Sequence, residues 1–225
     1  MCNLSSRFHA CYDGTRPGAV PGDLAERAVV QKAKPEIRDG FKFRAGHVAL
    51  DLAGTLAARF KPSPRELLAH PSDLGRWLIA AEMTDAMPEV TQTDVALART
   101  LRESIYSLVL ARIHHKALSD EARRALNRIA AEASAVPQLG KDSRIRVSGN
   151  TPGLLASIAR DAILLLGGAV SKRLRQCEGE SCALLFLDTS RSGERRWCSM
   201  SGCGNKFKIA EFRRRQRLNP TGSKS

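Results

Sequence analysis

Apolar residues recur every three or four positions through the middle of the chain, the spacing of helices that bury one face. The longest such stretch runs from Thr93 to about His115, a second follows Ser119, and a third extends from Thr151 to Gly167. Ser119 is a favoured N-cap residue, and the acidic residues after it suit a helix N-terminus. The pattern predicts a mainly helical body. Its expected core positions are Val95, Ala98, Leu101, Ile105, Leu108, Ile113, Ala122, Leu126, Ile129, Ala133, Leu154, Leu155, Ile158, Ala162, Leu165 and Leu166.

The pattern before this stretch is weaker and mixes two periods. Residues 41–44 alternate like a short strand, and residues 47–60 are interpreted as a helix, although a strand–turn–strand alternative fits almost as well. Ser63 and Glu66 have the spacing of a capping box, which predicts a short helix there. A further helix is expected to begin at Ser72 or at the residue after it.

The two ends and one internal segment read differently from the body. Residues 1–40 are rich in proline and glycine, which predicts a flexible extension with one short helix from about Asp23 to Ala33. Residues 141–147 alternate basic and apolar side chains like a strand, and residues 219–225 are expected to be a disordered tail.

Charge separates the C-terminal quarter from the rest. The 36 Lys and Arg residues exceed the 23 Asp and Glu residues by 13. From residue 172 onward, 13 basic and 5 acidic residues give a net +8. The longest apolar stretch, Ala162 to Val170, is too short to cross a bilayer, and the N-terminal residues lack the apolar middle of a secretory signal. We therefore expect a cytoplasmic protein with no membrane partner.

Four of the six cysteines fall in two tight pairs near the C-terminus. Each pair has four residues between its members, and fifteen residues separate the pairs. Such spacing can place four thiolates around one tetrahedral zinc ion, which would be structural because no coordination position stays open. The alternative is four free or buried thiols. The predicted metal ligands are Cys177, Cys182, Cys198 and Cys203.

The intervening residues and those that follow suggest a small basic fold. Residues 183–188 are strand-like, and residues 195–199 are the expected returning strand of a hairpin. Residues 204–217 are expected to form a helix whose Phe207, Ala210 and Phe212 rest on that hairpin. Clustered cations on a small rigid module fit a nucleic-acid binder, although a solvated basic tail is the alternative. The candidate contacts are Arg191, Arg195, Arg196, Asn205, Lys206, Lys208, Arg213, Arg214, Arg215 and Arg217.

Other chemistry has less support. Asp51 and Thr55 lie one helical turn apart and are candidate ligand-binding residues, with a local cap or hydrogen bond as the alternative. Cys2, His9 and Cys11 lack a fourth metal-binding partner and are expected to be ordinary exposed residues. No phosphate-binding loop, nucleophile elbow or His-Glu-x-x-His motif is present, so an enzyme is not expected.

The residues CEGESC and LFLDTSRSGERRWCSMSGCGNK resemble the CGNR zinc-finger family of bacterial proteins. The four cysteines named above fall on its zinc-ligand pattern, and the resemblance covers Arg173 to Lys208. Cys203, Gly204 and Asn205 match its signature, whereas Lys206 stands in place of the final Arg. A lysine keeps the charge but not the bidentate geometry of a guanidinium group.

A looser resemblance extends upstream. FRAGHVALDLAGTL, LARTLRESIYSLV and TPGLLASIARDAILLL are similar to the helical domain that precedes this finger in the family, which is described as a putative stress-induced transcription regulator. Gly54 stands where many members have Asn. The resemblance implies a bacterial, DNA-binding regulator linked to stress.

These observations predict a mainly α fold with a few short strands and a treble-clef-like zinc module. The expected function is DNA-binding transcriptional regulation, with double-stranded DNA as partner and a helical body that senses a small-molecule effector or forms a homodimer. An RNA-binding module, or an adaptor whose basic tail meets an acidic protein, remains the alternative. The expected parts are an extension (1–40), a helical sensor or dimerisation domain (41–171), a zinc module (172–218) and a tail (219–225).

Overall fold

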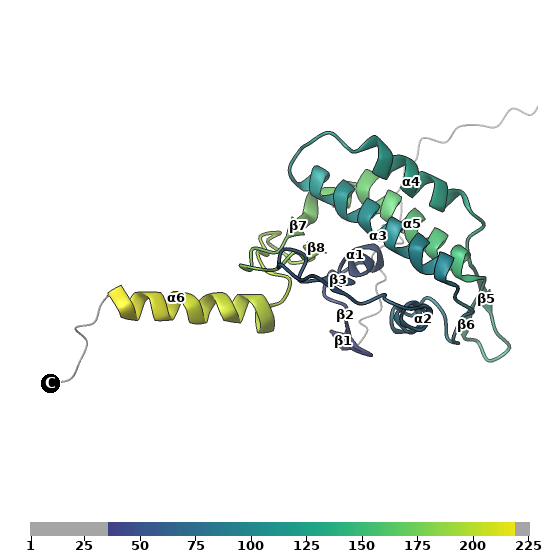
Figure 1. Ribbon diagram of the computed structural model, residues 1–225, viewed down its shortest axis with the longest axis horizontal. Helices are drawn as coiled ribbons and strands as arrows, with labels where there is room; N and C mark the ends of the chain where they lie inside the picture. Colours follow the sequence, from purple (N-terminus) through teal and green to yellow (C-terminus); the bar gives the residue numbers. More distant parts are fainter. Residues whose placement is uncertain (1–35, 219–225) are drawn as a thin grey trace, which may run out of the picture. The chain divides into compact units, whose positions relative to one another are not determined.

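A computed structural model describes residues 36–218, which belong to one compact unit. The described residues form a mainly helical body followed by a small four-cysteine segment (Figure 1). The α-helices are α1 (Val48–Ala53), α2 (Pro71–Ala80), α3 (Gln92–Ile113), α4 (Asp120–Ala131), α5 (Thr151–Gly167) and α6 (Asn205–Leu218). The short strands are β1 (Ile37–Arg38), β2 (Phe41–Lys42), β3 (Leu56–Ala57), β4 (Arg65–Glu66), β5 (Val136–Leu139), β6 (Ile145–Ser148), β7 (Leu174–Gln176) and β8 (Leu185–Leu187).

Helices α3, α4 and α5 pack against one another and form the centre of the body (Figure 1). All three were predicted from periodicity, and each begins at a side-chain cap. The Thr91 hydroxyl accepts the N–H of Asp94, whose carboxylate accepts the N–H of Thr91 in return. Ser119 caps α4 as predicted, and Asn150 caps α5. The predicted core positions on these helices are buried, apart from the half-buried Ile113 and Leu166 and the exposed Ala133.

The prediction of a single helix over residues 47–60 is wrong, because α1 ends at Ala53 and strand β3 follows. The turn between them is closed by the Thr55 hydroxyl, which donates to the Leu52 carbonyl at 2.7 Å. The Thr55 carbonyl then accepts the N–H of Leu67, so the chain continues as the β3–β4 pair. Pairing with a strand ten residues away, which local spacing does not reveal, ends the helix.

The predicted capping box at Ser63 is also wrong, because Glu66 lies in strand β4. Its carboxylate accepts the N–H of Leu68 and two N–H groups of the Arg102 guanidinium, at 2.7 and 2.8 Å. Helix α2 was predicted, but it begins earlier than expected, at Pro71. Asp73 sits in its first turn and accepts the N–H of His70 at 2.9 Å.

The boundary of the predicted extension needs a correction. Residues 36–40, assigned to it, form β1 and a tight turn in which Asp39 and Gly40 have φ values of 47° and 78°. The Arg76 guanidinium holds this turn by binding the Asp39 carboxylate at 2.7 Å. The rest of the extension with its predicted helix and its cysteines, and the tail at 219–225, lie outside the described residues.

The hairpin β5–β6 projects from the body before α5. Strand β6 matches the end of the predicted strand at 141–147, whereas β5, which contains Pro137, was not predicted. Across the described part of the chain, no helix has both the length and the apolarity needed to cross a bilayer.

The four-cysteine segment shares its core with the helical body. Leu174, Leu185 and Phe186 of strands β7 and β8 are at most 2% exposed and belong to the same buried cluster as the helices. Helix α3 contacts both strands. The N–H of Leu187 donates to the carbonyl of Ala45 in the loop before α1, at 2.7 Å. The segment is therefore fixed to the body by packing as well as by the chain.

Arg102 is a buried residue of α3 that forms an ion pair with Glu66 of the β3–β4 pair, and its loss should destabilise the fold. It is 4% exposed and bridges Glu66 and Glu103. We expect Arg102→Ala to lower the free energy of unfolding by about 2–4 kcal/mol, because two carboxylates lose their buried partner. The exposed Arg124→Ala control should change it by less than about 0.5 kcal/mol. Urea denaturation measures both, and equal effects would contradict the prediction.

Candidate metal centre and nucleic-acid interface

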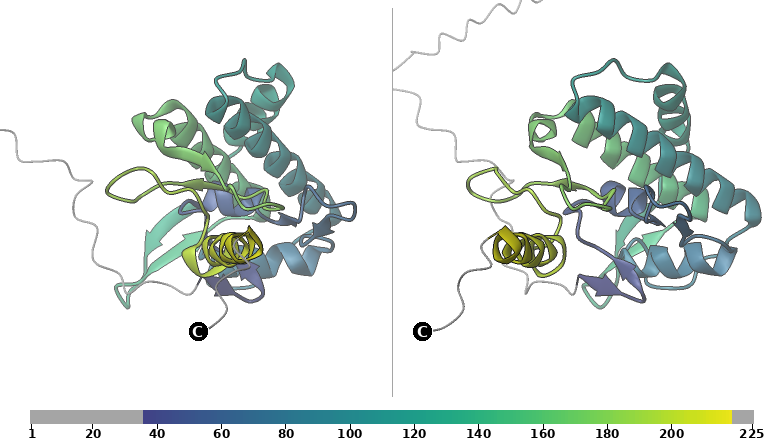
Figure 2. Two further views of the ribbon diagram at one scale, coloured as in Figure 1. Left: turned by 90° about the vertical axis from the view of Figure 1, so that its left-hand side faces the viewer. Right: turned by 60° about the vertical axis from the view of Figure 1, so that its left-hand side comes forward.

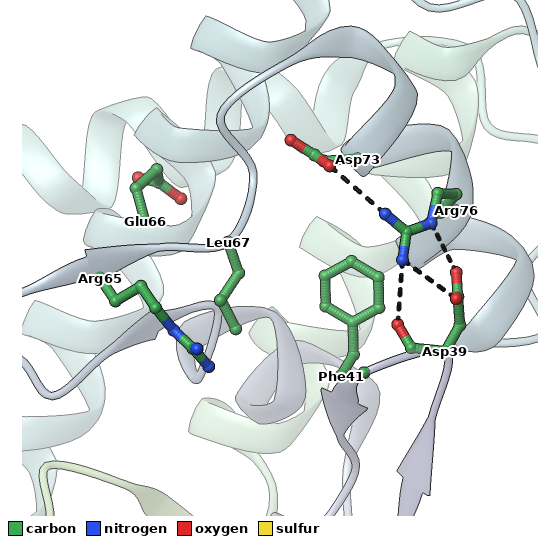
Figure 3. Close-up of a pocket in the computed structure, with 8 residues that line it drawn as sticks. Asp39, Phe41, Arg65, Glu66, Leu67, Asp73 and Arg76 are labelled. Carbon is green, nitrogen blue, oxygen red and sulfur yellow. Dashed lines mark hydrogen bonds and ion pairs between the residues drawn. The ribbon is translucent and has the colours of Figure 1, made fainter.

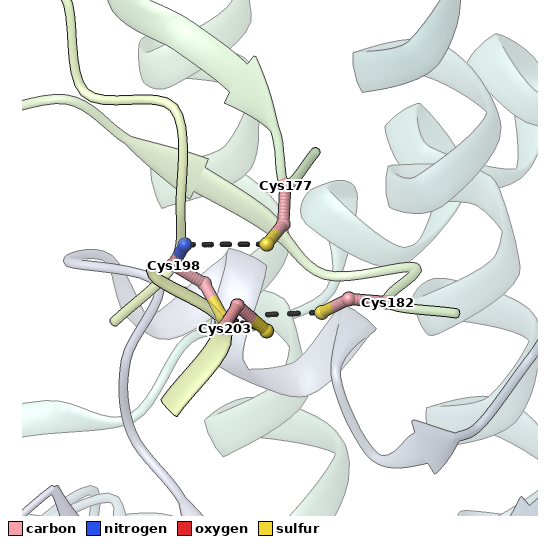
Figure 4. Close-up of side chains that lie close together, drawn as sticks. All are labelled: Cys177, Cys182, Cys198 and Cys203. Atoms are coloured by element: carbon pink, nitrogen blue, oxygen red, sulfur yellow. Dashed lines mark hydrogen bonds between the residues drawn. The ribbon is translucent and has the colours of Figure 1, made fainter. Parts of the chain in front are cut away.

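The four predicted cysteines converge on one point (Figure 4). Their sulfur atoms all lie within 4.8 Å of one another. The Sγ of Cys198 lies 3.9 Å from that of Cys182 and 3.8 Å from that of Cys203. A tetrahedral zinc ion with bonds of about 2.3 Å separates its sulfur ligands by about 3.8 Å. The four side chains therefore fit one zinc ion with no open position.

The first pair of cysteines lies on the turn that joins β7 to β8. Cys177 follows β7 directly and donates its N–H to the Leu184 carbonyl, while the N–H of Cys182 donates to the Gly179 carbonyl. A Cβ atom at Gly179 would lie 3.0 Å from the Cys203 sulfur. Glycine at 179 thus leaves room for the fourth ligand, as tight ligand turns require.

The second pair closes the site from the other side. The N–H of Cys198 donates to the Cys177 sulfur at 3.3 Å, and so does the N–H of Gly179 at 3.5 Å. Cys203 lies in the π-helical turn η2 (Met200–Gly204), which runs directly into α6. The fourth ligand is therefore joined to the start of the basic helix.

The predicted returning strand at 195–199 is wrong, because β8 pairs with β7 instead. Residues 195–199 are held by side chains. The N–H of Arg195 donates to the Asp188 carboxylate, and its guanidinium donates to the carbonyls of Trp197 and Cys198 and lies over the Phe186 ring. Asp188 is fully buried and was missed by the sequence reading, since a lone carboxylate after a strand gives no distinctive signal.

The electrostatics of the sulfur cluster favour a cation. Hydrogen bonds from the thiols of Cys182 and Cys198 lower the pKa of Cys177 to about 2. The same interaction raises the pKa of Cys182 to about 11, and the pKa of Cys198 is raised as well. One thiolate is therefore held by two neighbouring thiols, and four adjacent thiolates require a positive ion among them.

Several cations predicted to contact nucleic acid are engaged within the protein. Besides Arg195, Arg196 binds Glu178 at 2.6 Å and lies over the Trp197 ring. Arg214 and Arg215 both bind Glu211 of the same helix, at 2.9 and 3.1 Å. These ion pairs lie at the surface and are correspondingly weak.

Other predicted contacts are exposed without a side-chain hydrogen bond or ion pair to any residue of the described range. They are Arg191, Asn205, Lys206, Lys208 and Arg213. Arg217 is also exposed, and its Nε donates to the Arg213 carbonyl at 3.4 Å. These side chains are therefore available to an external partner.

Of the α6 residues predicted to rest on the hairpin of residues 183–199, Phe207 contacts it and the other two do not. The Phe207 ring packs against Trp197 with centroids 5.3 Å apart, but Ala210 is exposed and Phe212 is 60% exposed. Figure 1 and the right-hand view of Figure 2 show α6 apart from the other helices. The prediction failed for Ala210 and Phe212 because the apolar side chains of β7 and β8 are already packed against the helical body.

Asp51 and Thr55 are both buried and make local hydrogen bonds. Asp51 accepts the N–H of Ala45 at 3.0 Å, and Thr55 donates to a carbonyl within its own turn. Neither lines the two cavities described next, so their role in ligand binding stays a prediction.

Two cavities open on the helical body. The first, of about 290 Å³, is lined in part by Arg76, which forms ion pairs with Asp39 and Asp73 (Figure 3). The second, of about 490 Å³, lies between α3 and α4. Its lining residues are Thr93, Asp94, Leu97, Thr100, Ala125, Arg128, Ile129, Glu132 and Pro152.

Asp51 should make stability depend on pH. Burial raises its pKa from 3.8 to about 7, although the Ala45 N–H and the charge of Arg38 oppose the rise. As pH climbs from about 4 to 7, the unfolded chain loses this proton and the folded chain keeps it, so stability falls across that window. Asp51→Asn keeps the acceptor and cannot ionise.

We expect the stability of Asp51→Asn relative to the unaltered chain to increase by roughly 2–4 kcal/mol between pH 4.5 and pH 8. Urea denaturation at both pH values measures this difference, with the exposed Asp85→Asn as control. A difference that does not change with pH would contradict the prediction.

The metal centre predicts one zinc ion per chain by elemental analysis. Cys182→Ser and Cys203→Ser should each lose zinc and lower the melting temperature, because metal binding contributes directly to folding free energy. Cys11→Ser, outside the cluster, should keep both zinc and melting temperature. Full zinc content in both ligand variants would overturn the assignment.

Comparisons with known proteins agree with this geometry. Residues 173–216 match the CGNR zinc finger, and residues 46–169 match the ABATE family, described as "putative stress-induced transcription regulator". No curated protein matches the chain. The four converging cysteines are those of the finger, so the segment holds one structural zinc ion. Because the ABATE match covers more than half of the 225 residues, the chain belongs to this regulator family and ends in a CGNR zinc finger.

Proposed function

We propose that this regulator binds double-stranded DNA through its zinc finger and α6. The observation that carries the proposal is an exposed basic helix whose first turn is anchored to a zinc ligand. Cys203 lies two residues before α6, and Lys206, Lys208 and Arg213 extend from the helix without partners in the described range. Because α6 is joined to a zinc ligand, its cations lose less conformational entropy when they bind phosphates.

The charge distribution supports the same proposal. A zinc ion with four thiolates carries a formal −2. Within the finger, Arg195 donates to the Cys198 carbonyl and Arg196 binds Glu178, so these two cations are already engaged. The remaining exposed cations are left to act on a partner. A polyanion such as DNA suits this arrangement, since phosphate contacts supply most of the sequence-independent affinity.

We further propose that the helical body senses a small-molecule effector or mediates self-association. Its shared core with the finger gives a route by which a change in the body can reach α6. The cavity between α3 and α4, at about 490 Å³, is within the size range of small-molecule sites. Titration of the whole chain with candidate metabolites tests sensing through the melting temperature, and no shift with any of them would leave self-association.

The DNA proposal predicts a specific salt dependence. The triple variant Lys206→Ala, Lys208→Ala, Arg213→Ala should weaken binding to a 20-base-pair duplex at low salt. It should also reduce the slope of log affinity against log salt by about 2–3, because each lost phosphate contact removes about 0.9. Fluorescence anisotropy across a salt series measures both.

A charge-matched control is available on the body. The variant Lys116→Ala, Lys141→Ala, Arg144→Ala also removes two lysines and one arginine, all from exposed positions outside α6. It should leave the slope unchanged. If both triple variants behave alike, net charge rather than α6 governs binding, and the interface is misplaced.

The alternatives give different outcomes in the same assay. Structured RNA that outcompetes duplex DNA at matched salt would favour an RNA-binding module. Undetectable binding to duplex DNA at low salt would favour an adaptor that meets an acidic protein.

A further inference from the structure

One face of α6 is turned away from the finger and carries no cation. At about 100° per residue, four side chains fall within about 60° of one another around the helix. They form what we name the reading stripe: Asn205, Ile209, Phe212 and Gln216. Phe207, which packs against Trp197, lies on the opposite side of the helix axis. The stripe therefore points away from the one aromatic contact that anchors the helix.

All four side chains of the reading stripe are exposed. Ile209 is 43% exposed and Phe212 is 60% exposed, although both are apolar. No side-chain hydrogen bond of Asn205 or Gln216 to another described residue is present. Two free amides therefore flank two apolar groups on a polar, basic helix, and the fold of the described chain does not use these four side chains.

Cations border the stripe on both sides. Lys206, Arg213 and Arg217 follow one edge, and Lys208 and Arg215 follow the other. Arg215 is 75% exposed on its side chain, so its ion pair with Glu211 is weak and can exchange for a phosphate. An uncharged central stripe between two basic edges is complementary to a DNA groove, where base edges lie between two phosphate strands.

The dimensions fit the major groove. A helix with its side chains is about 10–12 Å across, and the major groove of B-DNA is about 12 Å wide. The rise from Asn205 to Gln216 is about 16 Å, the length of about five base pairs. The major groove of A-form RNA is too narrow for side chains to read, which favours DNA as the occupant.

We infer that α6 is a major-groove recognition helix whose reading stripe selects A·T base pairs. Asn and Gln amides pair bidentately with N6 and N7 of adenine, and apolar side chains contact the C5-methyl group of thymine. Amide, apolar, apolar and amide groups in succession match a short run of A·T pairs. The inference rests on the proposed DNA binding and adds which bases are read and by which residues.

Selection from a library of duplexes with a 12-base-pair random region tests the inference on the zinc-loaded whole chain. The enriched site should contain a run of A·T pairs. Replacing its thymines by deoxyuridine removes only the methyl group. This should weaken binding, because Ile209 and Phe212 lose the group that they contact. Replacing its adenines by 7-deazaadenine removes N7. This should weaken binding, because the amides of Asn205 and Gln216 lose one of their two hydrogen bonds to adenine.

Matched variants connect each base group to its side chain. Asn205→Ala and Gln216→Ala should each reduce preference for the selected site over a scrambled duplex by roughly 5- to 150-fold, and should be insensitive to 7-deazaadenine at their own position. Phe212→Ala should be insensitive to deoxyuridine at its own position and stay sensitive at the position that Ile209 contacts. Lys206→Ala and Arg213→Ala should weaken both duplexes alike. Because all these positions are exposed, zinc content and melting temperature should stay unchanged.

The outcomes separate this inference from the proposed function. Binding with no enriched site, or stripe variants that keep full preference, would overturn base reading while DNA binding stands. No binding to any duplex at low salt would overturn both. Concentration-dependent dimerisation lost in Phe212→Ala, with unchanged DNA preference, would assign the stripe to a second copy of the chain instead.

Discussion

The convergence of four sulfur atoms within 4.8 Å is the constraint on which the C-terminal quarter of this protein depends. Segments that supply them have little secondary structure of their own: a turn after β7, an irregular segment before Cys198 and a π-helical turn before α6. Thiols at this separation cannot all ionise without a cation, and a zinc ion removes that conflict while joining the segments. The direction of α6 follows, because Cys203 belongs to the turn that starts it.

The finger is held by the helical body through a short loop before α1. Ala45 accepts the N–H of Leu187 in β8 and donates its own N–H to the buried carboxylate of Asp51. Gly46 has a φ of 74°, and a Cβ atom there would lie 3.3 Å from the Leu187 carbonyl. Gly54 packs even more tightly, since a Cβ atom there would lie 2.9 Å from the Leu184 side chain. An Asn side chain at position 54 would thus need a shifted Leu184.

The same junction explains why the body and the finger are mechanically linked. Asp51, with a pKa raised to about 7 by burial, lies one hydrogen bond away from the backbone that pairs with β8. Cys177 and Cys198 are buried in the same core cluster as α3 and α5. The described residues of the body and the finger are therefore joined by packing and hydrogen bonds as well as by the chain.

Sequence alone determined the long helices, because the three-to-four spacing of apolar residues and a capping residue such as Ser119 are signals carried within a few turns of the chain. It also determined the metal ligands, since the spacing of Cys177, Cys182, Cys198 and Cys203 constrains their chemistry independently of the fold. Tertiary structure decided the rest. Strand pairing ended α1 at Ala53. Glu66 forms an ion pair with Arg102 instead of capping a helix. Tertiary structure also divided the cations, since Arg195 supports the finger while Lys206 is left exposed. Composition counts charges, but only contacts between residues distant in the chain determine which charges stay free.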